Sequence, residues 1–234
     1  MITIENLQVN YGKFNVLKNL NWSLDKEKIH GLAGLNGSGK TTLFHTMMKL
    51  KNPVIGSIKI CGKAASRKEM VLLETRNFFY AKITGREYLR LLSYKNPGFD
   101  IRGWNELFRL PLKKLIDHYS TGMKKKLAFM GVLAVDKPIL LLDEPFNGID
   151  MESNRVIKQI IEILATKGKT IIITSHLMES LTGLCDTISF LHNGNIMFTK
   201  EKTHFHEIEN EIFSDKKDTD HYISRLLGSK KDQA

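Results

Sequence analysis

Residues 34–41 read Gly34-Leu35-Asn36-Gly37-Ser38-Gly39-Lys40-Thr41. This stretch fits the pattern G-x-x-x-x-G-K-[ST], whose glycines let backbone N–H groups close around phosphate oxygens. In that pattern Lys40 neutralises the β- and γ-phosphates of a nucleotide, and the Thr41 hydroxyl binds Mg²⁺. The flanking residues fit as well, because the apolar run 29–33 predicts a strand before the loop and 41–50 predicts a helix after it. We therefore predict a phosphate-binding loop that opens a helix, whose N-terminal dipole favours anions.

Two acidic residues, Asp143 and Glu144, follow a buried strand predicted at 139–142. Asp143 at the strand tip is placed to hold Mg²⁺, and Glu144 is placed beside the γ-phosphate as general base or to orient the attacking water. The pair alone would fit two surface acids before a turn, but the phosphate-binding loop favours the catalytic interpretation. His176 follows a second buried strand, 171–173, and that end of a strand faces the ligand crevice of an open α/β sheet.

The arrangement of apolar residues predicts an α/β fold. Buried strands alternate with helical segments such as 156–164, which is typical of a largely parallel sheet with helices on both sides. Residues 2–24 alternate like a small antiparallel sheet, and 188–198 predicts a hairpin. Residues 84–135 show helical periodicity and no strong strand. The predicted fold class is therefore α/β, with a mostly parallel sheet core, an N-terminal antiparallel β subdomain and an inserted helical subdomain.

Composition excludes several classes of protein. Of the 234 residues, 42% are hydrophobic and 26% are charged, which is ordinary for a globular protein and argues against disordered, collagen-like or disulfide-rich chains. No apolar run approaches the ~18 residues of a membrane span. We expect no signal peptide, and we expect Cys61 and Cys185 to be free thiols in a reducing compartment.

The net charge is +10, and the densest basic run is Lys124-Lys125-Lys126. The commonest interpretation of such a charge balance is a solvated basic face, while nucleic acid, an acidic membrane surface and nucleotide phosphates are alternatives. No interleaved aromatic residues accompany these lysines, so we expect no nucleic-acid partner.

Together these motifs resemble the nucleotide-binding subunit of ABC transporters, over about residues 1–200. The stretch 143–150 is similar to the family's acidic pair and D-loop, and His176 is similar to its switch histidine. The diagnostic segment is Tyr119-Ser120-Thr121-Gly122-Met123, which resembles the family signature L-S-G-G-Q. Its serine lies 80 residues after Lys40 and 23 before Asp143, between the loop and the acidic pair as the family requires.

The resemblance implies a P-loop NTPase fold of the ABC ATPase type that binds Mg-ATP and hydrolyses ATP. It implies that Lys40, Glu144 and His176 are catalytic, with Glu144 activating water and His176 contacting the γ-phosphate. Thr41 and Asp143 would hold Mg²⁺. The residues implied to contact ATP are Tyr11 (stacked on adenine), Gly34, Leu35, Asn36, Gly37, Ser38, Gly39, Lys40, Thr41, Thr42 and, from a second subunit, Ser120 and Gly122.

The chain departs from the family pattern in two places. Thr121 and Met123 replace the first glycine and the glutamine of the signature, a variant similar to that of ABC subunits with separate membrane subunits of the export-associated type. Thr75 stands where the family's Q-loop has glutamine, with Glu74 beside it. A threonine hydroxyl is two carbons closer to the backbone than a glutamine amide. We therefore expect that Thr75 does not reach a metal-bound water unaided, and Glu74 is the first alternative.

The resemblance also implies partners and a location. Two ABC ATPase subunits, identical or different, would dimerise head to tail around two ATP molecules and drive a separate transmembrane permease. The chain would then be cytoplasmic and peripheral at the cytoplasmic face of the cell membrane. The aromatic stretch 77–80 fits either a pocket for the permease's coupling helix or this chain's own core.

Within one ABC ATPase domain over 1–234 we predict an α/β core with its β subdomain at 1–83 and 136–199. The helical signature subdomain would cover 84–135, and a tail would follow at 200–234, opening with a surface helix.

Two other functions stay open at this point. One is a soluble ABC ATPase without a transporter, such as an iron–sulfur cluster assembly ATPase. DNA-repair members need a coiled-coil insertion, and the sequence contains no heptad run. Translation-factor members resemble two fused copies, and this chain has one. The other alternative, a non-hydrolysing regulator, is disfavoured by Glu144 and His176.

Overall fold

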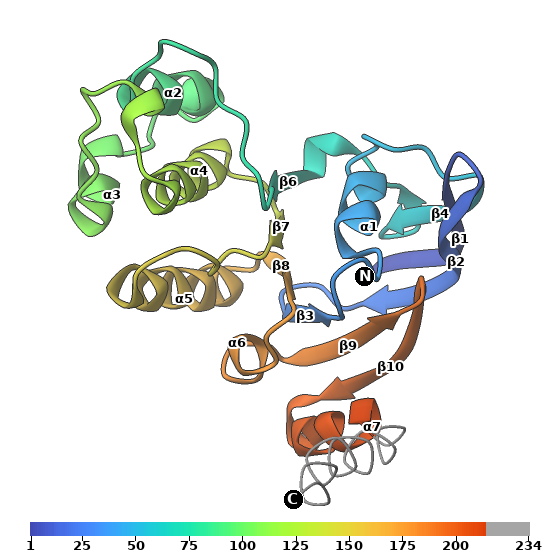
Figure 1. Ribbon diagram of the computed structural model, residues 1–234. Helices are drawn as coiled ribbons and strands as arrows, with labels where there is room; N and C mark the ends of the chain where they lie inside the picture. Colours follow the sequence, from blue (N-terminus) through green and yellow to red (C-terminus); the bar gives the residue numbers. More distant parts are fainter. Residues whose placement is uncertain (214–234) are drawn as a thin grey trace, which may run out of the picture.

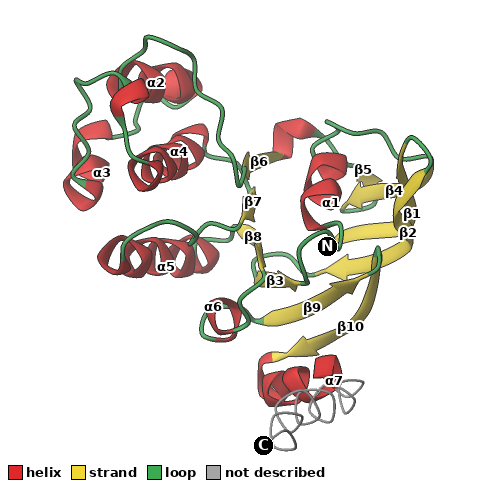
Figure 2. Cartoon of the chain, viewed as in Figure 1, coloured by secondary structure: helices red, strands yellow, loops and turns green. Residues whose placement is uncertain are grey.

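Two sheets and the helices packed on them form the fold, which a computed structural model describes for residues 1–213 (Figures 1 and 2). The strands are β1 (Ile2–Tyr11), β2 (Phe14–Leu24), β3 (Ile29–Ala33), β4 (Ile55–Ile60), β5 (Lys63–Ala64), β6 (Met70–Leu73), β7 (Ile139–Asp143), β8 (Thr170–Ser175), β9 (Thr187–His192) and β10 (Asn195–Glu201). The α-helices are α1 (Lys40–Met47), α2 (Gly85–Leu92), α3 (Ile101–Phe108), α4 (Thr121–Val135), α5 (Met151–Thr166), α6 (Glu179–Thr182) and α7 (Ile208–Phe213).

The larger sheet has six strands in the order β10-β9-β3-β8-β7-β6. Every neighbouring pair in it is parallel except the β9–β10 hairpin. The smaller sheet, in the order β2-β1-β4-β5, is antiparallel throughout. The predicted α/β core and N-terminal antiparallel subdomain are therefore confirmed. The predicted hairpin is also present, and it turns at Asn193 and Gly194, both of which have positive φ.

Alternate residues of the central strands face opposite layers of the molecule. On β8, Ile171 and Ile173 pack with α4 and α5, whereas Ile172 packs with α1 and the antiparallel sheet. Successive side chains on a strand point to opposite faces, so this isoleucine run covers both faces. All three are fully buried, and each such side chain contributes about 1.5–3 kcal/mol. This burial holds β8 rigidly at the centre, where its carboxyl end supports the site.

The predicted helical insertion lies between β6 and β7. Figure 1 shows α2, α3 and α4 as a lobe beside the sheet, at the upper left. A capping box formed by Thr84 and Glu87 starts α2. Ser120 is the N-cap of α4, because its Oγ accepts a hydrogen bond from the Met123 N–H at 3.2 Å. The signature segment therefore begins a helix, as the sequence predicts.

Two details differ from the sequence prediction. The sequence predicts no strand at β6, which is an edge strand that pairs only with β7. Its run of four apolar residues is too short to separate strand from helix by periodicity. The helix predicted over 41–50 ends at Met47, because Lys49 adopts a left-handed φ of 53°.

The segment predicted as a surface helix after residue 200 is helical but partly buried. A 3₁₀ helix (Lys202–Glu207) leads into α7, and Phe205 and Ile208 pack into the core. The remainder of the predicted tail, 214–234, lies outside the described residues. The division of 1–234 into one domain with these subdomains stays a prediction.

Both cysteines are free thiols, as predicted. No helix within residues 1–213 is both long and apolar enough to cross a membrane.

Candidate active site

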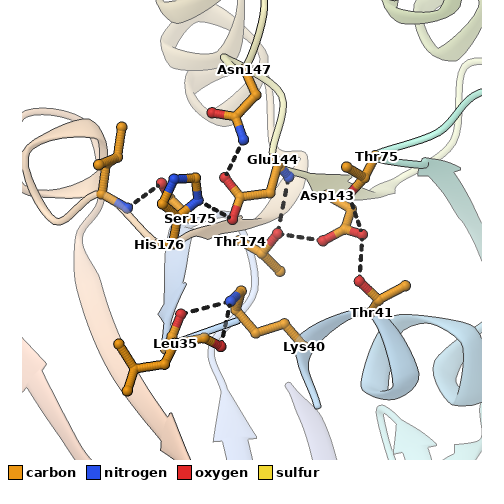
Figure 3. Close-up of polar contacts among 12 residues, drawn as sticks. Leu35, Lys40, Thr41, Thr75, Asp143, Glu144, Asn147, Thr174, Ser175 and His176 are labelled. Carbon is orange, nitrogen blue, oxygen red and sulfur yellow. Dashed lines mark hydrogen bonds and ion pairs between the residues drawn. The ribbon is translucent and has the colours of Figure 1, made fainter. Parts of the chain in front are cut away.

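Three neighbouring parallel strands end at the same edge of the sheet and bring predicted residues together (Figure 3). The phosphate loop follows β3, Asp143 ends β7 with Glu144 directly after it, and His176 follows β8. Carboxyl ends of parallel strands share one edge, and ligands of open α/β sheets bind there. Residues more than a hundred positions apart therefore form one site.

The phosphate loop turns tightly from β3 into α1. Gly39 has a φ of +113°, and a Cβ at this position would lie 2.8 Å from Leu17 Cδ2, so the turn requires glycine. Lys40 is buried, and its Nζ donates to the carbonyl oxygens of Gly34 (2.6 Å) and Leu35 (3.2 Å). Burial lowers the pKa of Lys40, and the two carboxylates after β7 act in the opposite direction. The ammonium group thus lies within the loop that the motif assigns to phosphate.

Three threonine hydroxyls surround the buried carboxylate of Asp143. Thr41 Oγ1 and Thr75 Oγ1 donate to Oδ2 at 2.8 and 2.7 Å, and Thr174 Oγ1 donates to Oδ1 at 2.6 Å. They come from α1, from the loop after β6 and from β8. A buried charge is tolerated where hydrogen bonds compensate its lost hydration. This carboxylate is therefore fixed in one orientation, with the Thr41 hydroxyl beside it.

The side chain of Glu144 is held between two donors. His176 Nδ1 donates to Oε1 at 2.9 Å, and Asn147 Nδ2 donates to Oε2 at 3.1 Å (Figure 3). The backbone is held as well, because the Glu144 N–H donates to Thr174 Oγ1 at 3.0 Å. A general base must be oriented toward the proton that it accepts. The arrangement supplies that orientation at both the side chain and the main chain.

These groups line a cleft of about 580 Å³. The predicted site residues that line it are Asn36, Gly37, Gly39, Lys40, Thr41, Thr42, Asp143, Glu144 and His176. The structure thus gathers the predicted catalytic and metal-binding residues around one space of the size that small-molecule sites occupy.

The other predicted contacts lie elsewhere. Gly34, Leu35 and Ser38 belong to the loop but not to the lining of the cleft. Tyr11 also lies outside it, and Lys51 Nζ covers the Tyr11 ring at 4.4 Å from the centroid. Ser120 and Gly122 stand at the start of α4, where Ser120 is exposed. Their predicted ATP contacts stay predictions.

The loop after β6 contributes residues whose geometry the sequence alone did not give. The Thr75 hydroxyl does not reach outward but binds Asp143 directly. Glu74 also lines the cleft, and its Oε1 accepts a hydrogen bond from His45 Nε2 at 3.0 Å. Thr174 and Asn147 were not singled out as site residues, although both lie beside motifs. The available signal was their position in the sequence, since Thr174 lies two residues before His176 and Asn147 lies three residues after Glu144.

The oxygen atoms of Thr41 and Asp143 are chemically suited to Mg²⁺, which prefers hard oxygen ligands and completes its shell with phosphates and water. Within residues 1–213 no cluster of three or more His, Cys, Asp or Glu side chains could hold a metal. The donor set therefore fits a nucleotide-bound Mg²⁺ and not an all-protein metal site.

Comparison with known proteins identifies the class. The family model described as "ABC transporter" matches residues 17–147. The chain belongs to this family, as the motifs predict, and it is an ATP-binding ATPase of the ABC type.

Two similar curated proteins are named for transport. The "Lantibiotic transport ATP-binding protein SrtF" of Streptococcus pyogenes is 30% identical over 227 residues, covering 92% of this chain and 96% of that protein. The "Bacitracin transport ATP-binding protein BcrA" of Enterococcus faecalis is 31% identical over 212 residues, covering 84% of this chain and 68% of that protein.

Solved structures agree on the fold. The "Structure of ATP binding subunit of ABC transporter" superposes with a TM-score of 0.81 and 24% identity, covering 92% of this chain and 93% of that one. The "Dimeric structure of a post-hydrolysis state of the ATP-binding cassette MJ0796 bound to ADP and Pi" gives a TM-score of 0.76 and 20% identity. The match covers 86% of this chain and 99% of that one. The predicted ABC ATPase fold is therefore confirmed.

Proposed function

We propose that two copies of this chain, or this chain and a related one, bind two Mg-ATP between them and hydrolyse ATP to drive a separate membrane permease. The observation that carries the proposal is the single cleft in which Lys40, Asp143 and Glu144 meet. It combines a phosphate cradle, oxygen ligands for Mg²⁺ and an oriented carboxylate, which are the parts that phosphoryl transfer to water requires.

In the proposed mechanism the loop N–H groups and Lys40 hold the β- and γ-phosphates. Bound Mg²⁺ would neutralise charge on the phosphate oxygens, held by Thr41 and Asp143. Glu144 accepts a proton from the attacking water, while His176 keeps its carboxylate oriented and contacts the γ-phosphate. Each role follows from a group that lines the cleft.

The dimer is proposed from the position of the signature. Ser120 and Gly122 do not line this chain's own cleft, and the exposed start of α4 presents N–H groups and a favourable dipole to an anion. The γ-phosphate of a second subunit's ATP is an anion of the required kind. A two-fold arrangement would let each chain complete the other's site.

The metal ligand is tested by removing one hydroxyl. We expect Thr41→Ala to raise the Mg²⁺ concentration for half-maximal turnover at least about tenfold, because even indirect partners of a metal ligand commonly contribute that much to affinity. Calorimetry of ATP binding with and without Mg²⁺ should show the same loss of metal dependence. The matched control, Thr41→Ser, keeps the hydroxyl and should stay near wild type. Equal Mg²⁺ dependence of all three proteins would remove Thr41 from the metal site.

The permease contact is proposed from the loop between β6 and α2. Phe78 and Tyr80 are 76% and 60% exposed and contact each other edge to face, whereas Phe79 packs on Tyr88 of α2. Exposed paired aromatics are typical anchors of protein interfaces. A separate cleft of about 690 Å³ lies between α2 and α3, and most of its charged lining residues are basic. Its charged lining residues are Arg86, Arg90, Arg102, Arg109, Lys113 and Glu106. Two interpretations were open for 77–80, a partner pocket and this chain's own core. Phe79 packs into the core, whereas the exposed Phe78 and Tyr80 suit a partner.

The double variant Phe78→Ala with Tyr80→Ala tests this contact. We expect it to lose at least about tenfold in copurification with its membrane permease, because truncating interface aromatics commonly removes 2 kcal/mol or more. Tyr94→Ala is the control, since Tyr94 is also an aromatic residue, lies just after α2 and is 84% exposed. Full copurification of the double variant would place the permease contact elsewhere.

A further inference from the structure

Lys125 is a buried lysine in the helix that begins with the signature. It is only 4% exposed, and its Nζ donates to the backbone carbonyl oxygen of Glu144 at 2.5 Å. Burial lowers the pKa of Lys125, while the neighbouring carboxylates of Glu144 and Asp143 raise it. A lysine is rarely buried without a specific partner. Its partner here belongs to the residue proposed as the general base.

The backbone of Glu144 adopts a strained conformation that hydrogen bonds must stabilise. Its φ is +50°, in the left-handed region that residues with a Cβ rarely adopt. Three hydrogen bonds hold this conformation. The Glu144 N–H donates to Thr174 Oγ1, and the Glu144 carbonyl oxygen accepts from Lys125 Nζ and, at 3.3 Å, from the Asn147 N–H. Strained residues persist only where their surroundings determine them, and they cluster at functional sites. Lys125 therefore holds one side of a strained catalytic position.

The first turns of α4 contact the rest of the same loop. A Cβ on Gly122 would lie 2.8 Å from the carbonyl oxygen of Gly148, so the helix and the loop approach at van der Waals distance. Lys126 Nζ lies 3.2 Å from Asp150 Oδ2. With Lys125, these contacts attach α4 to both ends and the middle of the segment 144–150.

We propose that Lys125 is a positioning residue for Glu144, which fixes the left-handed backbone at this position and thereby aims the carboxylate at the attacking water. The proposal rests on the proposed function, in which Glu144 is the base. Lys125 does not line the ATP cleft, so it is not a phosphate ligand of its own site. It acts on the reaction through its hydrogen bond to the main chain of Glu144.

Replacement of Lys125 by Met tests this role, because Met has a similar length and no donor. We expect kcat to fall about ten- to hundredfold, since a displacement near 1 Å of a catalytic group has an effect of that size. The dissociation constant for Mg-ATP, measured by equilibrium binding, should stay within about twofold of wild type, because Lys125 does not itself line the cleft. The control Lys124→Met changes the same residue type one position earlier on α4, and it should keep wild-type kcat.

Two further variants separate the donor from the packing. Lys125→Arg keeps a charged N–H donor and should recover turnover above that of Lys125→Met. Lys125→Gln is too short to reach the carbonyl oxygen and should lose kcat as Lys125→Met does, which keeps the test valid if the Met variant does not fold. Wild-type kcat in either the Met or the Gln variant would overturn the inference, and so would a parallel loss of kcat, ATP affinity and melting temperature. Failure of the proposed function is distinguishable, because it would appear as turnover in a Glu144→Gln variant with Lys125 intact.

Discussion

Glu144→Gln is expected to bind ATP with near wild-type affinity and to lose ATP turnover at least about a hundredfold, as loss of a general base commonly does. The amide is nearly isosteric with the carboxylate, and its single oxygen can still accept a hydrogen bond from His176 or from Asn147. It cannot accept a proton from water. The substitution therefore removes the chemistry and leaves the shape of the cleft.

Two measurements check this expectation. Phosphate release gives turnover, and a sizing column run with Mg-ATP should show an accumulated dimer, because ATP that is not hydrolysed keeps the two subunits together. Glu152→Gln is the control, since Glu152 is an exposed carboxylate nearby in the first turn of α5. Turnover of Glu144→Gln at the rate of the control would exclude Glu144 as the base.

A mixture of two inactive variants is expected to regain activity if each site is shared between two chains. Lys40→Ala removes the phosphate-binding ammonium, and Ser120→Arg blocks the start of α4 that would face the partner's ATP. Each pure variant should be inactive. A hybrid dimer has one site with both defects and one with an intact loop and an intact signature. Random 1:1 mixing makes half the dimers hybrid, so about a quarter of wild-type turnover should return.

Hybrid formation must be shown independently, for example by differential tagging and tandem purification. Strong cooperativity between the two sites would lower the recovered fraction, so any turnover above the sum of the pure variants supports sharing. Hybrids that form and bind ATP yet hydrolyse none would contradict the shared site.

The positions of the candidate catalytic residues could be predicted because each lies in a local pattern at a strand end. The phosphate loop, the acids after β7 and His176 after β8 each follow an apolar run that identifies a buried strand. Parallel pairing then brings the three ends together without further information. The α/β class follows from the same runs.

Residues that act through non-local contacts could not be predicted in this way. Thr75 reaches Asp143 across 68 positions, and Lys125 reaches Glu144 from another subdomain. A basic run such as 124–126 is commonly part of a solvated face, but its middle residue, Lys125, is buried. Helical phase contained a signal, because Lys125 lies three residues after Gly122 and four before Phe129, on the buried side of α4.

The left-handed backbone at Glu144 also bears on how this protein can be stabilised. Glycine adopts positive φ without steric strain and asparagine tolerates it, so stability alone would select one of them at this position. The proposed role of Glu144 as the base accounts for glutamate at this position, at a cost of roughly 1–2 kcal/mol of backbone strain. Engineering that follows backbone preference would thus remove the proposed base first. Stabilising substitutions should therefore be sought outside the loop after β7. At other positions a gain in thermal stability does not require replacing the proposed base.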